Sequence, residues 1–281
     1  MQIEHKSIIS KNSFKLLIPV QSNSEIKDFS FLSNYIKVEE SNTIIDSLQR
    51  VYNSKTAEST TYTFPLANGL VGVQFIPIKP TDNYRSIKNK FRGIANNIKS
   101  DSDTQDCYLL LSQEIGQIEG GIKQAMLNGV FLHDYSVGIY KSDKLKQKAS
   151  KSFFILSKEQ DSEEHEALIF KAEQLARSQK DIFKLVDAPS NKKSPAVLAA
   201  YAEQIANEGS DRLHTQVLHK KEIEEQGFHG LLAVNQASPA PPVFIKMEYR
   251  SNHTDSKHIG IVGKGVTFDT GGISLKRSSN L

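Results

Sequence analysis

Apolar positions in the first half of the chain follow two spacings in turn. Phe14–Val20 and Val71–Ile78 are short apolar runs typical of strands, as is the run around Cys107. Between the last two runs, residues Tyr84–Ile98 predict a helix because apolar side chains recur there at helical spacing, namely Ile87, Phe91, Ile94 and Ile98. This succession of strands and helices predicts an N-terminal α/β domain.

The polarity of the chain changes in its middle. After an expected helix over Glu114–Leu127 and a short strand at Gly138–Tyr140, residues 142–164 are rich in Lys, Ser, Asp and Glu. Such a shift in composition is typical of a domain boundary. An amphipathic helix is then predicted over Glu164–Val186. We therefore expect an N-terminal α/β domain over 1–150, a linker and connecting helix over 151–186, and the first part of a second α/β domain, with a central mixed sheet, over 187–281.

The second domain begins with the signals of a helix. Ser194 followed by Pro195 is typical of an N-cap and the first helical position, and Gly209 is typical of the residue after a helix. Further elements are expected, in order, over Thr215–Leu218 (strand), Lys221–Gln226 (short helix) and Val243–Tyr249 (strand).

Composition is that of an ordinary globular protein. Of 281 residues, 38% are hydrophobic and 24% are charged, and the formal net charge of +3 is too small to favour a nucleic acid partner. The basic positions of the expected helix, Lys88, Lys90, Arg92 and Lys99, are typical of a solvated face. The single cysteine excludes an intramolecular disulfide. Because the chain has neither a leader-like start nor a membrane-length apolar window, we expect a cytoplasmic protein with no membrane segment.

The stretch Lys264–Lys276 concentrates charged residues and glycines in Lys-Gly-Val-Thr-Phe-Asp-Thr-Gly-Gly-Ile-Ser-Leu-Lys. Strand alternation over Val266–Asp269 sends Asp269 to the face opposite Phe268, and the glycines that follow allow a sharp turn. A carboxylate at a strand end of an α/β fold is well placed to bind a divalent cation. Lys264 could coordinate a metal only as its neutral amine.

Three other interpretations of this stretch compete. Gly260–Gly265 superficially resembles a phosphate loop, but the glycine spacing differs and no Ser or Thr follows Lys264. Phe268–Gly271 matches the Phe-Asp-Thr-Gly of aspartic proteases, but that chemistry needs a second copy or a dimer in an all-β protein. For these residues alone a glycine-rich turn is the default, because one carboxylate and one amine do not complete a metal shell.

The histidines do not suggest a rival metal site. His214 and His219 fall on an expected strand at positions that point to opposite faces, and His165 lacks the second His of a zinc-binding helix. We expect surface or structural roles for them.

Gly263–Lys276 resembles the first active-site block of the leucyl aminopeptidases, the M17 metallopeptidase family of cytosol aminopeptidases. Two upstream blocks resemble the same family in the same order: Leu185–Pro195, and Gly230–Ser238 followed by two prolines. Asn235 and Ala237 stand where family members usually carry glycine, which concerns local backbone geometry. The resemblance is specific over about Leu185 to Lys276. Before that, the chain is similar to the family's N-terminal domain only in length and in strand-helix order.

The resemblance implies roles for three residues. Lys264 would be a ligand of one metal ion and Asp269 a ligand shared by two, while Lys276 would be the catalytic lysine that polarises the scissile carbonyl. The implied cofactors are two divalent metal ions, Mn or Zn, and the implied substrates are peptides with a free N-terminus, with leucine-type preference. The resemblance also implies a homohexamer for the complete protein.

The family's remaining ligands, further carboxylates and a catalytic arginine, have no counterpart before Leu281. We therefore expect an aminopeptidase truncated within its catalytic domain and inactive as this chain. The alternative is a non-catalytic protein in which the N-terminal α/β domain and the stub that follows it serve binding or assembly.

Overall fold

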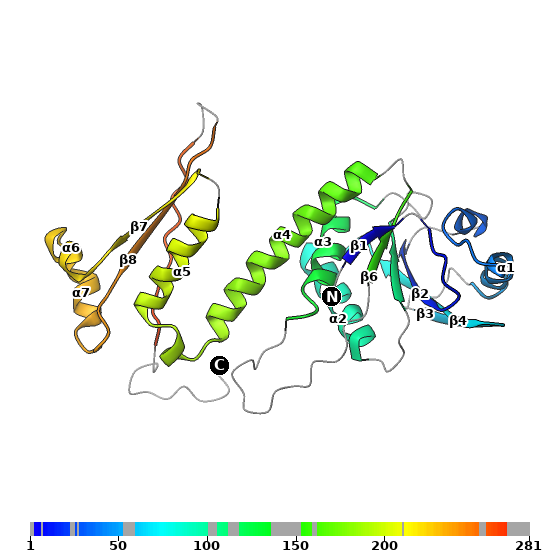
Figure 1. Cartoon of the computed structure of the whole chain (residues 1–281), viewed down its shortest axis with the longest axis horizontal. Helices are drawn as coiled ribbons and strands as arrows, with labels where there is room; N and C mark the ends of the chain where they lie inside the picture. Colours follow the sequence, from blue (N-terminus) through cyan, green and yellow to red (C-terminus); the bar gives the residue numbers. More distant parts are fainter. Residues whose placement is uncertain are drawn as a thin grey trace. The chain divides into compact units, whose positions relative to one another are not determined.

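The computed structural model divides the chain into two compact units, Met1–Phe183 (unit 1) and Lys184–Leu281 (unit 2) (Figure 1). It describes residues 3–6, 8–22, 26, 28–52, 60–100, 106–111, 118–135, 153–158, 162–209, 211–252 and 257–268. Each unit is an α/β arrangement, so the predicted fold class is confirmed.

Unit 1 is built on a mixed sheet with the strand order β1-β6-β5-β2-β4-β3. The first five strands in that order run parallel to their neighbours, and β3 pairs antiparallel with β4 at the edge. The strands are β1 (Ile3–Lys6), β2 (Phe14–Gln21), β3 (Thr60–Leu66), β4 (Gly69–Ile78), β5 (Asp106–Leu110) and β6 (Phe153–Leu156).

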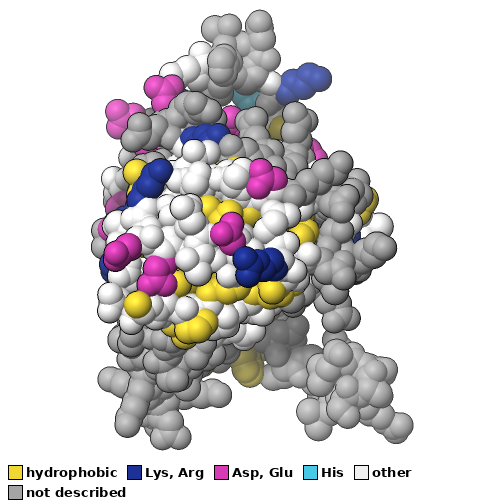
Figure 2. All heavy atoms as spheres, turned by 90° about the vertical axis from the view of Figure 1, so that its right-hand side faces the viewer, with side chains coloured by type: hydrophobic (Ala, Val, Ile, Leu, Met, Phe, Trp, Pro, Cys, Tyr) yellow, Lys and Arg dark blue, Asp and Glu magenta, His cyan; other side chains and the backbone are white. Residues whose placement is uncertain are grey.

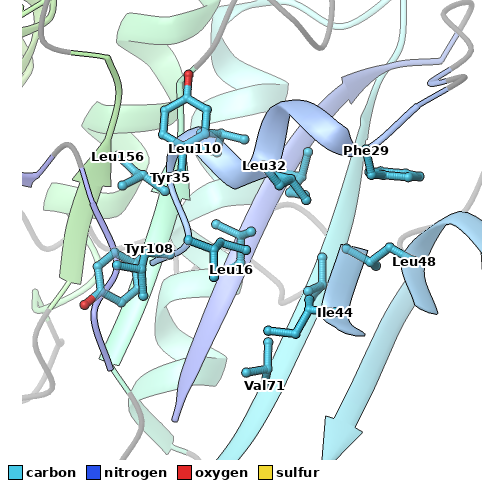
Figure 3. Packing of buried hydrophobic residues seen from close by; sticks show 14 of the residues in the cluster. Leu16, Phe29, Leu32, Tyr35, Ile44, Leu48, Val71, Tyr108, Leu110 and Leu156 are labelled. Atoms are coloured by element: carbon cyan, nitrogen blue, oxygen red, sulfur yellow. The ribbon is translucent and has the colours of Figure 1, made fainter. Parts of the chain in front are cut away.

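Both faces of this sheet are buried, which explains why its central strands are almost uninterrupted apolar runs. Successive side chains of β2 enter opposite cores: Leu16 and Ile18 join one hydrophobic cluster and Leu17 joins the other. In the same way Tyr108 of β5 lies in the first cluster and Cys107 in the second. Figure 3 shows part of the first cluster, where Leu16, Tyr108 and Leu156 come from neighbouring strands.

Helices cover the two faces separately. The first cluster is closed by η1 (Ser30–Asn34) and α1 (Ser41–Val51), whose Leu32, Ile44 and Leu48 are fully buried. The second is closed by α2 (Tyr84–Ser100), α3 (Gly120–Phe131) and α4 (Ser162–Asp187). Nearly all of α3 from Lys123 onward is buried, so it is a core helix rather than a surface one.

Unit 2 has a smaller described framework. After the last residues of α4 come η4 (Ser190–Lys192), α5 (Pro195–Glu208), β7 (Leu213–Leu218), α6 (Lys220–Glu225), α7 (His229–Asn235) and β8 (Phe244–Tyr249). β7 and β8 form an antiparallel pair. The Thr215 hydroxyl of β7 donates to the Ala202 carbonyl of α5 at 3.4 Å, which places α5 against this pair.

The sheet of unit 1 extends past residue 150. β6 lies within 151–186, the range predicted as linker and connecting helix, and it pairs with both β1 and β5. The short apolar run Phe153–Leu156 is thus an inner strand of the sheet, because parallel partners on both sides satisfy its backbone hydrogen bonds. The three domain ranges otherwise stay a prediction. The strand expected at Gly138–Tyr140 and the first part of the helix expected from Glu114 lie outside the described residues.

Candidate metal and peptidase site

The three residues predicted for the site fall near or beyond the end of the described chain. Lys264 is described and exposed, in a segment, 257–268, that is neither helix nor strand. Asp269 and Lys276 lie outside the described residues. Only Lys264 of the three belongs to the described part of the chain, so the roles of all three stay a prediction.

The strand expected over Val266–Asp269 is not formed in its described part, residues 266–268. Val266 and Phe268 are 45% and 65% exposed, so the expected alternation does not place them on a buried face. The preceding apolar residues are more exposed still, since Ile261 is 92% and Val262 99% exposed. An apolar run becomes a strand only where a neighbouring strand satisfies its backbone, and no described strand pairs with this segment.

The described residues do not by themselves make up a metal site. No group of three or more His, Cys, Asp or Glu side chains that could hold a metal ion occurs in the described part of the chain. A lysine alone does not complete the shell of Zn or Mn, which favour several nitrogen or oxygen ligands. Any fit of the donor set to two cations thus depends on residues from Asp269 onward.

The two upstream sequence blocks have defined local structures. Leu185–Pro195 spans the end of α4, η4 and the start of α5, where Ser194 is the N-cap and Pro195 the first residue of the helix, as predicted. The Lys193 ammonium donates to the Val186 carbonyl at 2.8 Å, so this block folds back on the end of α4. This contact gives the junction between α4 and α5 a defined local geometry.

The second block contains the two positions where glycine was expected. Asn235 ends α7, its side-chain amide donates to the Ala240 carbonyl at 2.9 Å, and its own carbonyl accepts from the Ser238 N–H at 2.9 Å. Neither Asn235 nor Ala237 has a positive φ, since no described non-glycine residue does. Both departures from glycine are therefore accommodated by ordinary backbone geometry.

Charged residues on the polar face of β7 and β8 pair among themselves. The hydrogen bond and charge of Arg250, with smaller contributions from Lys246 and His214, lower the pKa of the Glu248 carboxyl. The Arg250 Nε lies 3.1 Å from Glu248 Oε1. This arrangement is a solvated surface network and holds no candidate nucleophile.

Two histidines have structural roles, as expected, although His219 does not lie on the predicted strand. His219 is not part of β7 but caps α6, with the Glu222 side chain accepting from the His219 backbone N–H in a capping box. His133 is buried, and its Nδ1 lies 2.7 Å from the Val130 carbonyl. The spacing of Glu222 three residues after His219 was the available signal for the first of these roles.

The described basic residues of α2 are partly engaged within unit 1. The Lys90 ammonium contacts the Asp82 carboxylate at 2.9 Å and the Pro77 carbonyl at 2.8 Å. Arg92 donates to the Tyr135 carbonyl at 3.4 Å. On the face shown in Figure 2, Lys and Arg are interspersed with Asp and Glu. Among the described helices, none is long and apolar enough to cross a membrane.

The sequence is similar to proteins of one known family. The catalytic-domain model of the cytosol aminopeptidase family matches residues 182–281. Probable cytosol aminopeptidases of three bacteria are similar in sequence. The one from Bacillus subtilis is 29% identical over 223 residues, covering 77% of this chain and 44% of the relative. The one from Bacillus licheniformis is 35% identical over 158 residues, covering 56% and 31%. The one from Syntrophotalea carbinolica is 50% identical over 92 residues, covering 33% and 18%.

The fold has a counterpart among solved structures. A mutant of the tomato leucine aminopeptidase superposes with a TM-score of 0.68 at 22% identity, over 96% of this chain and 54% of that one. The two units thus define an α/β protein with the fold of this enzyme. Residues 182–281 match the catalytic domain of the M17 cytosol aminopeptidase family, and the sequence and structure similarities support a relationship of the chain to that family. The chain spans less than half the length of the curated relatives it matches.

Proposed function

We propose that the chain contributes to a dinuclear metal-dependent aminopeptidase that releases N-terminal residues of the leucine type from peptides. The observation that carries this proposal is the nearly continuous resemblance of Gly263–Lys276 to the family's first active-site block, inside the segment that matches the catalytic domain. Peptides with a free N-terminus, a cytoplasmic location and assembly into a homohexamer belong to the same proposal and rest on the family resemblance alone.

Three residues have distinct roles in this proposal. Lys264 would be a ligand of one of two metal ions, Mn or Zn, and Asp269 would be a ligand shared by both ions. When bound, the two ions would supply activation of a water molecule and a binding point for the free amine of the substrate. Lys276 would stabilise negative charge on the carbonyl oxygen of the scissile peptide.

The 281-residue chain is proposed to be inactive by itself. Its candidate block supplies one carboxylate and one amine for two divalent cations, whereas such ions require several ligands each. The exposed position of Lys264, outside any described strand, agrees with an incomplete site.

A chimera tests this proposal. Residues 182–281 would replace the matching segment of the Bacillus subtilis relative, and hydrolysis of leucine anilide would be measured with Mn or Zn. We expect no activity from the 281-residue chain, metal-dependent activity from the chimera, and no hydrolysis by the chimera of a peptide whose N-terminus is acetylated.

Variants in the chimera then separate the roles. Asp269→Asn and Lys276→Met should each lower kcat by at least about a hundredfold, in line with the loss of one group that stabilises the transition state. Asp211→Asn, at an exposed position of unit 2, is the matched control and should leave activity unchanged. A chimera that folds and is inactive before any substitution would instead favour the binding or assembly function.

A further inference from the structure

β7 and β8 lie side by side in unit 2 (Figure 1), and the outer edge of β8 has no partner among the described strands. The Arg250 N–H donates to the Arg212 carbonyl at 2.8 Å, just past the end of β8 and in the register of the strand pair. Backbone groups of an antiparallel strand face its partner at every second residue and face away at the residues between. Since Arg250 faces β7, the N–H and C=O groups of Ile245, Met247 and Tyr249 face the outer edge.

One face of β8 carries apolar side chains that α5 does not cover. The Thr215 hydroxyl bonds to α5 and Thr215 is paired with Met247, so Met247 lies on the α5 side of the sheet. Ile245 and Tyr249 lie on the same side, because side chains alternate along a strand. Met247 is nevertheless 43% exposed and Tyr249 is 65% exposed. A further strand beside β8 would cover these two side chains.

The opposite face of β8 carries charges of alternating sign. Lys246 and Glu248 lie there, with side chains that are 59% and 42% exposed. Glu248 accepts from Arg250, but the Lys246 ammonium stays 3.8 Å from Glu248 Oε2, beyond hydrogen-bond distance. A lysine on a sheet edge usually discourages pairing with another chain. Here it favours a partner strand that places a carboxylate opposite Lys246 and an ammonium opposite Glu248.

A second copy of β8 is such a strand. When two copies run antiparallel with Met247 opposite Met247, each Lys246 lies opposite Glu248 of the second copy. Each Ile245 then lies opposite Tyr249 of the second copy, on the apolar face. The same register joins the outward-facing backbone groups, because each residue that faces the edge meets another residue that faces it. The neighbouring registers keep this backbone match but pair less of β8.

We propose that a second copy of this chain docks along the outer edge of β8 in this antiparallel register, so that the two sheets join in the order β7-β8-β8-β7. The contact is symmetric about Met247, and it therefore closes as a dimer. The outer edge of β7 offers no such match, because His214 and Gln216, which lie on its polar face, form no pair of opposite charges. The dimer does not depend on the proposed peptidase function.

The helices leave room for the joined sheet. α5 lies against β7, through the Thr215–Ala202 hydrogen bond and through Gly209, whose added Cβ would meet the Leu213 side chain at 3.6 Å. Neighbouring strands are about 4.8 Å apart, so the two β7 strands would be about 14 Å apart. Packed helices need only about 8–10 Å between their axes. Both copies of α5 can therefore lie on the same face of the sheet, on either side of the exposed apolar side chains of β8.

Sedimentation equilibrium of the 281-residue chain over a range of concentrations tests the proposal. We expect a monomer–dimer equilibrium. Lys246→Glu and Glu248→Lys should each weaken dimerisation by at least roughly tenfold, because each sets like charges opposite one another in both symmetry-related pairs. An equimolar mixture of the two variants should dimerise again, since every pair in the mixed dimer then joins opposite charges. Lys221→Glu, at an exposed position of α6, makes the same charge change elsewhere and should leave dimerisation unchanged.

A chain that is monomeric at all concentrations overturns the proposal and leaves the edge of β8 to a strand of a different polypeptide. Association that neither charge variant weakens overturns it as well, as does a mixture of the two variants that stays monomeric. If a charge variant does not fold by circular dichroism, amide hydrogen exchange of the wild type decides. The outward-facing Met247 amide should then exchange more slowly as the chain concentration rises, and a rate independent of concentration is a negative result.

Discussion

Gly129 is the point at which α3 approaches the backbone of α2. A Cβ atom added there would lie 2.3 Å from the Lys88 carbonyl oxygen and 3.0 Å from the Arg92 nitrogen. Both atoms belong to a helix backbone, which cannot move aside as a side-chain tip can. We expect Gly129→Ala to lower the free energy of unfolding by about 2–3 kcal/mol, measured by urea denaturation.

Gly93 provides the matched control in the partner helix. It lies in the interior of α2, is exposed, and a Cβ added to it would meet nothing within 4 Å. Gly93→Ala should therefore raise stability by up to about 1 kcal/mol, through helix propensity. Equal effects of the two substitutions would show that the close approach at Gly129 does not hold in solution.

Tyr108 makes the stability of unit 1 depend on pH in the alkaline range. Burial, together with the charges of Asp106 and Cys107, raises its pKa from 10.0 to about 12. Its ring stacks on Phe154 with centroids 4.9 Å apart and meets the edge of Phe14 at 6.0 Å. A raised pKa means that the fold favours the neutral phenol. The contribution of this preference to the free energy of unfolding is therefore fully present below pH 10 and is lost as the pH rises toward 12.

The corresponding measurement compares the wild type with Tyr108→Phe. Tyrosinate absorbance should show that the variant lacks one phenol that ionises near pH 12, and the fall in stability between pH 10 and 12 should be smaller in the variant by up to about 2 kcal/mol. If the phenol that the variant lacks ionises near pH 10 in the wild type, the buried position of Tyr108 would be contradicted.

At the scale of elements, α4 is fastened to the segment that follows α3. The Lys180 ammonium lies 2.6 Å from the Asp134 carboxylate, and the rings of Phe183 and Tyr135 are 5.2 Å apart. Burial alone would raise the pKa of Asp134, but the hydrogen bond and charge of Lys180, helped by His133, hold it below its ordinary value. The pair therefore stabilises unit 1 above about pH 4 and loses that effect as the pH falls through the lowered pKa.

A double-mutant cycle with Asp134→Asn and Lys180→Met measures this attachment. Since both side chains are partly solvent-exposed, we expect a coupling energy of about 0.5–1 kcal/mol at pH 7 that disappears at pH 2. Coupling that is absent at pH 7 would mean that α4 is held to unit 1 by its apolar face alone.

The elements with strong periodicity were the ones that sequence could predict. Helices α2 and α4 and strands β2, β4 and β8 lie within one or two residues of their predicted ranges at most of their ends. β1 and α1 were not anticipated, and Phe153–Leu156 was read as part of a linker. Its place between β1 and β5 depends on pairing with residues far away in sequence, which no local pattern reports. Conversely, the apolar alternation at Val266 predicted a strand that no described partner completes.

For the whole molecule, the hydrophobic core is unevenly shared between the units. Both core clusters lie in unit 1. In the described part of unit 2, the buried hydrophobic residues are only Ala188, Ala199, Ala202, Leu218 and Ile223. Large apolar side chains such as Val234, Tyr249 and Ile259 are 74%, 65% and 84% exposed there. Unit 1 therefore has what a domain needs to fold independently, and the described part of unit 2 does not.

We expect a fragment of residues 1–187, which keeps α4 whole, to unfold in one cooperative thermal transition. A fragment of residues 188–281 should bind a hydrophobic dye and lack such a transition. Cooperative unfolding of the second fragment would contradict this division of the core.

The candidate site could be predicted from sequence as a motif but not as a geometry. The order of Lys264, Asp269 and Lys276 was enough to suggest the family, which the comparisons with known proteins support. The relative positions of the three side chains could not follow from it, because they depend on strands that must pair around the segment that carries them.

Counting metal ions tests the account of that site most directly. In the chimera that carries residues 182–281, elemental analysis after dialysis should find two Mn or Zn ions per chain, and fewer than one after Asp269→Asn. Lys276→Met should retain both ions and lose leucine anilide hydrolysis. Two ions retained after Asp269→Asn would contradict the role proposed for that carboxylate, and with it the dinuclear site.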